Sequence, residues 1–122
     1  MPLAKEIMMG GHSAIGADAM AGQVKPGISA AGTSATDATP LTASLNLVTT
    51  VASNTGVILL NCEIGDSQKV YQTGANPLKV YPPTSTQQIN QLSPGAAATL
   101  AANTLVEYQR WSATQWVAQL SA

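Results

Sequence analysis

The pattern of hydrophobic and polar positions changes near Ser44. From there onward, short apolar runs such as LNLVTTVA at 45–52 and GVILLNC at 56–62 are separated by turn residues, for example SNTG at 53–56. Short strands at regular spacing, with Gly, Asn, Asp and Pro between them, are typical of all-β sandwiches and barrels. We therefore predict a small antiparallel β-sandwich or barrel-like domain over residues 44–122.

The clearest local unit of this domain is QKVYQTGANPLKVY at 68–81, in which two KVY runs flank a loop with Gly, Asn and Pro. We predict a hairpin in which Val70 lies opposite Val80 and both side chains face the core. Tyr71 and Tyr81 would then lie on the other face, each beside a lysine. That face would be open to solvent or to a partner.

Residues 1–43 follow neither of these patterns. Gly or Pro recurs every few residues, and no helical or strand period is sustained. We predict an extended N-terminal arm rich in Gly, Ala, Ser and Thr. This composition is also typical of a disordered tail. The arm nevertheless carries apolar side chains that would be useful on binding a partner, namely Ile7, Met8, Met9, Ile15 and Met20.

Composition indicates self-association and narrows the choice of partner. The 122-residue chain has no Phe, 4% aromatic residues and 9% charged residues. One domain must therefore build its core from small and aliphatic side chains, which remove little apolar surface from water, so oligomerisation would add stability. The five cations are spread along the chain, a pattern that does not favour binding to nucleic acid. No apolar run approaches the length of a bilayer span, so we expect no membrane partner.

Few residues could carry catalysis or bind a metal. His12, the single histidine, lies near Ser13 and Asp18, but all three belong to the Gly-rich arm, where no rigid scaffold holds a nucleophile beside its base. A zinc site needs several Cys and His ligands, and Cys62 is the single cysteine. We expect no enzyme activity, no cofactor and no metal site.

The two tryptophans allow two interpretations. Trp111 and Trp116 flank the turn at 112–114, and such rings either fill a core or stack on a sugar. Core packing is favoured, because a Phe-free domain has few other large side chains. In the alternative, Trp111 and Trp116 join Tyr71 and Tyr81 as contact residues for a host-surface glycan.

Three blocks of sequence resemble small virion proteins of tailed bacteriophages: LNLVTTVASNTGV at 45–57, GANPLKVYPPTSTQQIN at 74–90 and SATQWVA at 112–118. The family comprises capsid decoration (cement) proteins and head-fibre proteins. The resemblance implies a β-rich domain, commonly trimeric, that stands on the outer face of an icosahedral shell and is attached partly by an N-terminal segment. It implies no cofactor and no catalysis.

We therefore expect a capsid decoration protein that trimerises and stabilises the shell by binding the major capsid protein through the apolar side chains of the arm. Such a protein would be made in the host cytoplasm and located on the outer capsid surface of the virion. The alternative is a tail-fibre or head-fibre module that binds host-surface glycan through the four aromatic residues named above.

The small, aromatic-poor core predicts that the purified protein is an oligomer, and the resemblance makes a trimer the specific expectation. Light scattering during size-exclusion chromatography at micromolar concentration measures the mass directly. A monomer mass under these conditions would contradict the prediction.

Overall fold

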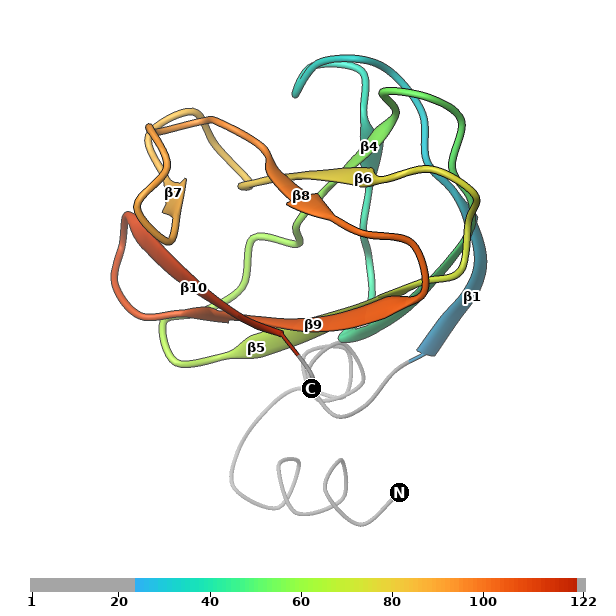
Figure 1. The fold of residues 1–122 in the computed structure, drawn as a ribbon. Helices are drawn as coiled ribbons and strands as arrows, with labels where there is room; N and C mark the ends of the chain where they lie inside the picture. Colours follow the sequence, from blue (N-terminus) through green and yellow to red (C-terminus); the bar gives the residue numbers. More distant parts are fainter. Residues whose placement is uncertain (1–23, 121–122) are drawn as a thin grey trace, which may run out of the picture.

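The computed structural model describes residues 24–120, which form an all-β unit without a helix (Figure 1). Successive strands are short and are joined by turns and irregular corners. The ten strands of this part of the chain are β1 (Val24–Ser29), β2 (Thr39–Pro40), β3 (Leu45–Thr50), β4 (Gly56–Ile58), β5 (Ser67–Gln72), β6 (Leu78–Tyr81), β7 (Gln88–Ile89), β8 (Ala98–Leu100), β9 (Thr104–Arg110) and β10 (Gln115–Leu120).

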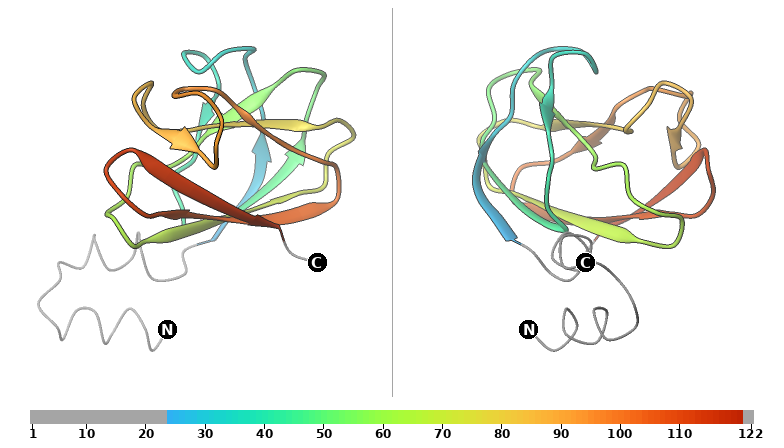
Figure 2. Two further views of the ribbon diagram at one scale, coloured as in Figure 1. Left: turned by 60° about the vertical axis from the view of Figure 1, so that its left-hand side comes forward. Right: turned by 180° about the vertical axis from the view of Figure 1, so that it is seen from behind.

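The first eight strands alternate between two sheets that face each other (Figure 2). The six-stranded sheet has the order β1-β3-β5-β9-β10-β7, and the four-stranded sheet has the order β2-β4-β6-β8. β1, β3 and β5 pair in parallel, and so do β2, β4 and β6. The chain therefore winds as a β-solenoid of about 4 turns.

The winding changes direction after β6. β8 pairs antiparallel with β6, and β9 pairs antiparallel with β5. β10 then returns beside β9 as the second strand of a hairpin, and the short β7 pairs with β10. Antiparallel strands thus close this end of the solenoid.

The all-β class is confirmed, but the antiparallel sandwich or barrel-like arrangement is wrong. Hairpins join successive strands in such folds, whereas here successive strands up to β8 lie in different sheets. The predicted hairpin between the two KVY runs is wrong for the same reason, since Val70 belongs to β5 and Val80 to β6. Both valines are nevertheless fully buried, because the inner faces of the two sheets share one core.

Residues 24–43, which we expected in the arm, form the first strands of the two sheets. β1 pairs with β3 and β2 pairs with β4, while Ile28 and Leu41 belong to the core. The change in composition at Ser44 therefore does not mark the start of the β-structured unit. The arm residues proposed for capsid contact lie outside the described residues; they are Ile7, Met8, Met9, Ile15 and Met20.

Strand β1 is an irregular edge strand. Its register against β3 shifts on either side of Ile28. The strand contains Pro26, which lacks an N–H donor, and Gly27, whose φ of 66° lies in the left-handed region. Pro and Gly are tolerated in a strand where it bulges or lies at an edge. We did not predict a strand at this position because the sequence contains both residues.

The core between the sheets consists mainly of aliphatic side chains, as the composition predicted. Val48, Val70 and Val106 face inward from the six-stranded sheet, opposite Val57 and Val80 of the four-stranded sheet. Fully burying one such side chain contributes roughly 1.5–3 kcal/mol. The two largest side chains in the core come from the C-terminal hairpin, Tyr108 and Trp116.

Buried amide side chains bind the backbone where the chain leaves or enters a sheet. Gln68 accepts a hydrogen bond from the backbone N–H of Leu60 at 2.9 Å and donates to its carbonyl at 2.8 Å. Gln72 donates to the carbonyls of Asn76 and Leu100, each at 3.0 Å. These bonds pair polar backbone groups at the ends of strands and in the segments between them, which would be costly to bury alone.

We predict that Val80→Asp unfolds the protein, because it places an unpaired carboxylate in the shared core. The expected loss is more than about 3 kcal/mol of unfolding free energy. Circular dichroism melts measure this loss. Lys79→Ala should melt like the wild type, and so should Thr99→Asp, which adds the same charge at an exposed position opposite Lys79. If Val80→Asp melted at the same temperature as the wild type, the inward-facing side of β6 would be wrongly assigned.

Candidate interaction surface

The outer face of the six-stranded sheet bears an apolar patch built by two rows of side chains that cross the strands. Strand register aligns Leu47, Tyr71 and Leu105 in one row. The adjacent row begins with Val24 and Leu45. We call these five residues the outer patch. Their side chains point outward because positions alternate along a strand, and neighbours such as Val48 and Val70 point into the core.

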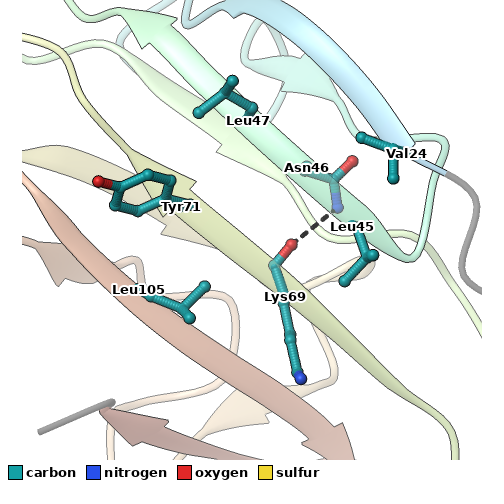
Figure 3. Close-up of a pocket in the computed structure, with 7 residues that line it drawn as sticks. All are labelled: Val24, Leu45, Asn46, Leu47, Lys69, Tyr71 and Leu105. Atoms are coloured by element: carbon teal, nitrogen blue, oxygen red, sulfur yellow. Dashed lines mark hydrogen bonds between the residues drawn. The ribbon is translucent and has the colours of Figure 1, made fainter.

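The outer patch forms a shallow depression of about 240 Å³ with almost wholly apolar walls (Figure 3). The side chain of Tyr71 is 45% exposed and that of Val24 is 59% exposed. Scattered apolar residues on a surface are ordinary, whereas a contiguous apolar patch is typical of a surface that binds another molecule. No other described side chain fills the depression beyond those that line it.

Two opposite charges lie beside the outer patch. Lys69 of β5 and Glu107 of β9 are direct cross-strand neighbours, in the same row as Val24 and Leu45. Opposite charges at such positions attract each other, with Cβ atoms roughly 4.5–5.5 Å apart. Among the outward positions of β3, β5, β9 and β10, these are the charged side chains.

The sequence did not single out the leucines of this surface. In LNLV at 45–48, hydrophobicity alone would bury Leu45 and Leu47 and expose Asn46. The structure does the opposite: Asn46 is 3% exposed, and its amide donates to the carbonyl of Ala43 at 2.9 Å and to that of Lys69 at 3.2 Å. The usable signal was Val48, whose inward position puts both leucines outside.

The four aromatic residues proposed for glycan contact do not lie on one surface. Trp116 is fully buried, and its indole N–H donates to Oε1 of Gln87 at 2.6 Å. Tyr81 is also buried, with its ring beside Gly56, where a Cβ atom would collide with it. Tyr71 lies in the middle of the six-stranded sheet, whereas Trp111 lies in the turn between β9 and β10.

Trp111 is the most exposed large aromatic side chain in the described part of the chain, at 64%. The preceding residue, Arg110, holds its turn in place. The guanidinium donates to the carbonyl of Ala113 at 3.0 Å and to Oδ1 of Asn61 at 3.2 Å. Because Asn61 belongs to the segment between β4 and β5, Arg110 ties that segment to the hairpin turn.

The titratable groups with shifted pKa values lie away from the outer patch and serve structural roles. Burial raises the pKa of the Cys62 thiol and that of the Tyr108 hydroxyl, which keeps both protonated. Hydrogen bonds from Ser34 lower the pKa of Asp37, whose carboxylate caps a turn. Residues 24–120 contain no cluster of three or more His, Cys, Asp or Glu residues suited to a metal ion. The same stretch has no helix able to cross a membrane.

Comparison of the chain with family models, curated proteins and solved structures finds no match in any of the three. The function proposed below is therefore based on the outer patch, on the fold and on the sequence resemblance described above. Catalytic use of His12 concerns a residue outside the described part of the chain.

We predict that the two tryptophans differ sharply in their effect on stability. Trp116→Ala should cost about 3–5 kcal/mol, because it removes a fully buried indole and leaves a cavity. Trp111→Ala should change the unfolding free energy by less than about 0.5 kcal/mol, since its ring is mostly in solvent. Urea titrations followed by circular dichroism measure both. Equal effects of the two substitutions would contradict the assignment.

Proposed function

We propose that this chain is a virion structural protein of a tailed bacteriophage, a capsid decoration (cement) protein. In this proposal it trimerises, binds the major capsid protein and stabilises the outer surface of the shell. The observation that carries the proposal is the outer patch, a contiguous apolar surface on a small unit. Such surfaces favour protein partners. The resemblance of three sequence blocks to phage virion proteins supports the same role.

The fold supports a structural role through its stiffness. Each turn of the solenoid is hydrogen-bonded to the next, so a load on one turn is shared by its neighbours. Charged residues make up only 9% of the chain, and depletion of charge is typical of the centre of protein interfaces. A stiff body with weakly charged surfaces suits permanent packing against other proteins.

The N-terminal segment supplies the attachment in this proposal. Ile7, Met8 and Met9 form a short apolar run, followed by Ile15 and Met20. Methionine adapts well to irregular pockets, and burial of these side chains on capsid protein would offset the entropy of ordering the segment. Many copies of a weak contact would hold the shell together through multivalency.

One observation favours the alternative of a glycan-binding fibre module. Trp111 is exposed on a turn that Arg110 holds in place, as a stacking platform for a sugar ring would need. Tyr81 and Trp116 are buried and could not share in that contact. Only Tyr71 and Trp111 therefore remain of the four candidates. Loss of glycan binding in Trp111→Ala would favour this alternative.

We predict that deletion of residues 1–23 abolishes or greatly weakens attachment to shells that lack the protein. The cut follows Gln23 because β1 begins at Val24. It removes all five apolar side chains proposed for capsid contact. Co-sedimentation of the shortened protein with undecorated shells measures the attachment.

The matched control for this deletion is the full chain with Leu92→Ser, which removes an apolar side chain that is 39% exposed on the solenoid itself. It should sediment with shells as the wild type does. Circular dichroism should show a folded β unit for both proteins. Full retention of shell binding after the deletion would show that the solenoid, and not the N-terminal segment, makes the contact with the shell.

A further inference from the structure

The two rows of the outer face have a property that appears when the face is set against a copy of itself. On the adjacent strands β5 and β9, one row contains Tyr71 beside Leu105. The other row contains Lys69 beside Glu107. In each row, therefore, the side chain on β5 differs in kind from its neighbour on β9.

A twofold axis parallel to these strands, midway between β5 and β9, makes the face complementary to its own copy. Rotation about this axis sets β5 of one copy opposite β9 of the other and keeps each row opposite itself. Lys69 then faces Glu107 of the second copy. Tyr71 faces Leu105 of the second copy, so charge meets opposite charge and apolar surface meets apolar surface.

The charges select this register over its neighbour. If the axis lay between β3 and β5 instead, Lys69 would face Leu45 of the second copy, since the two residues are paired across those strands. In that arrangement the ammonium group would keep Glu107 of its own sheet but would face an apolar side chain of the second copy instead of a second carboxylate, which is less favourable. The pattern of one cation beside one anion thus favours the axis between β5 and β9 over the axis between β3 and β5.

We propose that the outer patch binds a second copy of this chain, face to face about this twofold axis. The contact rests on the proposed structural role and extends it. An interface in which the same surface of both copies meets about a twofold axis joins two copies and no more. In a trimeric protein, the two copies therefore belong to different trimers, and the contact links neighbouring trimers across the shell.

The size of the face makes the contact weak for a single pair. Four central strands about 4.8 Å apart and about 20 Å long present roughly 400 Å² of sheet plane per copy. A standard stable interface buries about 800 Å² per partner. Pairing should therefore be visible only at high protein concentration in solution. On a shell, where each trimer offers several such faces, the same contact gains from multivalency.

Complementary charge variants test the contact. K69E carries acidic side chains at both positions, and E107K carries basic ones at both. Each variant alone should pair at least tenfold more weakly than the wild type, because like charges would face each other across the axis. An equimolar mixture of the two should recover pairing, with each pair containing one copy of each variant. Sedimentation velocity measures the pairing, and native mass spectrometry of one isotopically labelled variant identifies the mixed pairs.

Recovery in the mixture distinguishes a contact between copies from one within a copy. Each variant also sets like charges side by side in its own sheet, and mixing cannot relieve that repulsion. Lys79→Glu is the matched control, since Lys79 lies on β6 in the other sheet. This variant should pair as the wild type does. Tyr71→Ser provides a second test without a change in charge, and it should also weaken pairing.

Three results would overturn the inference: no paired species for the wild type at high concentration, unchanged pairing in K69E, or no recovery in the mixture. Pairing that depends on residues 1–23 but not on Lys69 would show that the arm occupies the patch, which also overturns it. Shell binding is measured separately. If wild type fails to sediment with shells yet pairs as described, the proposed function fails while the pairing stands.

Discussion

The structure depends on how its buried amide groups pair with the backbone at the corners of the solenoid. A chain that crosses from one sheet to the other twice in each turn leaves backbone donors and acceptors without strand neighbours. Gln68, Gln72 and Asn46 project from the inner face of the six-stranded sheet and bind such groups, the carbonyls of Leu60, Asn76 and Ala43. Between these corners β5 pairs in parallel with β3 and antiparallel with β9. The two rows of the outer face, including the row of Leu47, Tyr71 and Leu105, are a consequence of that pairing.

The sequence was sufficient to predict strands after Ser44, but it missed β1 and β2 and did not show how the strands stack. Alternation around Val70 and Val80 identified buried positions correctly, because any two-sheet fold with a shared core buries one face of each strand. The same alternation occurs in hairpins and in solenoids. What distinguishes them is the partner of each strand, and here β5 contacts β3 and β9 rather than β6. Hydrophobicity does not reveal such contacts.

The candidate surface was only partly visible in the sequence for a related reason. Tyr71 was expected to be outside and is, because it directly follows the buried Val70. Tyr81 was expected to be outside and is buried, because Gly56 on the neighbouring strand leaves space for its ring. Leu45 and Leu47 were overlooked because polar Asn46 takes the inward position between them. Each error arose where a glycine or a buried amide, rather than hydrophobicity, decided the direction of a side chain.

The edges of the two sheets limit the ways in which the protein could polymerise. β1 is interrupted by Pro26 and Gly27, while β7 and β2 contain two residues each and β8 contains three. Exposed straight edges recruit strands from other molecules and lead to fibres, and natural proteins avoid this with short or broken edges. A solenoid is open at its ends, so the danger is greatest in this architecture. Short and interrupted edges of this kind disfavour growth into a continuous cross-β filament at high local concentration, and they leave side chains rather than strand pairing as the means of contact with another molecule.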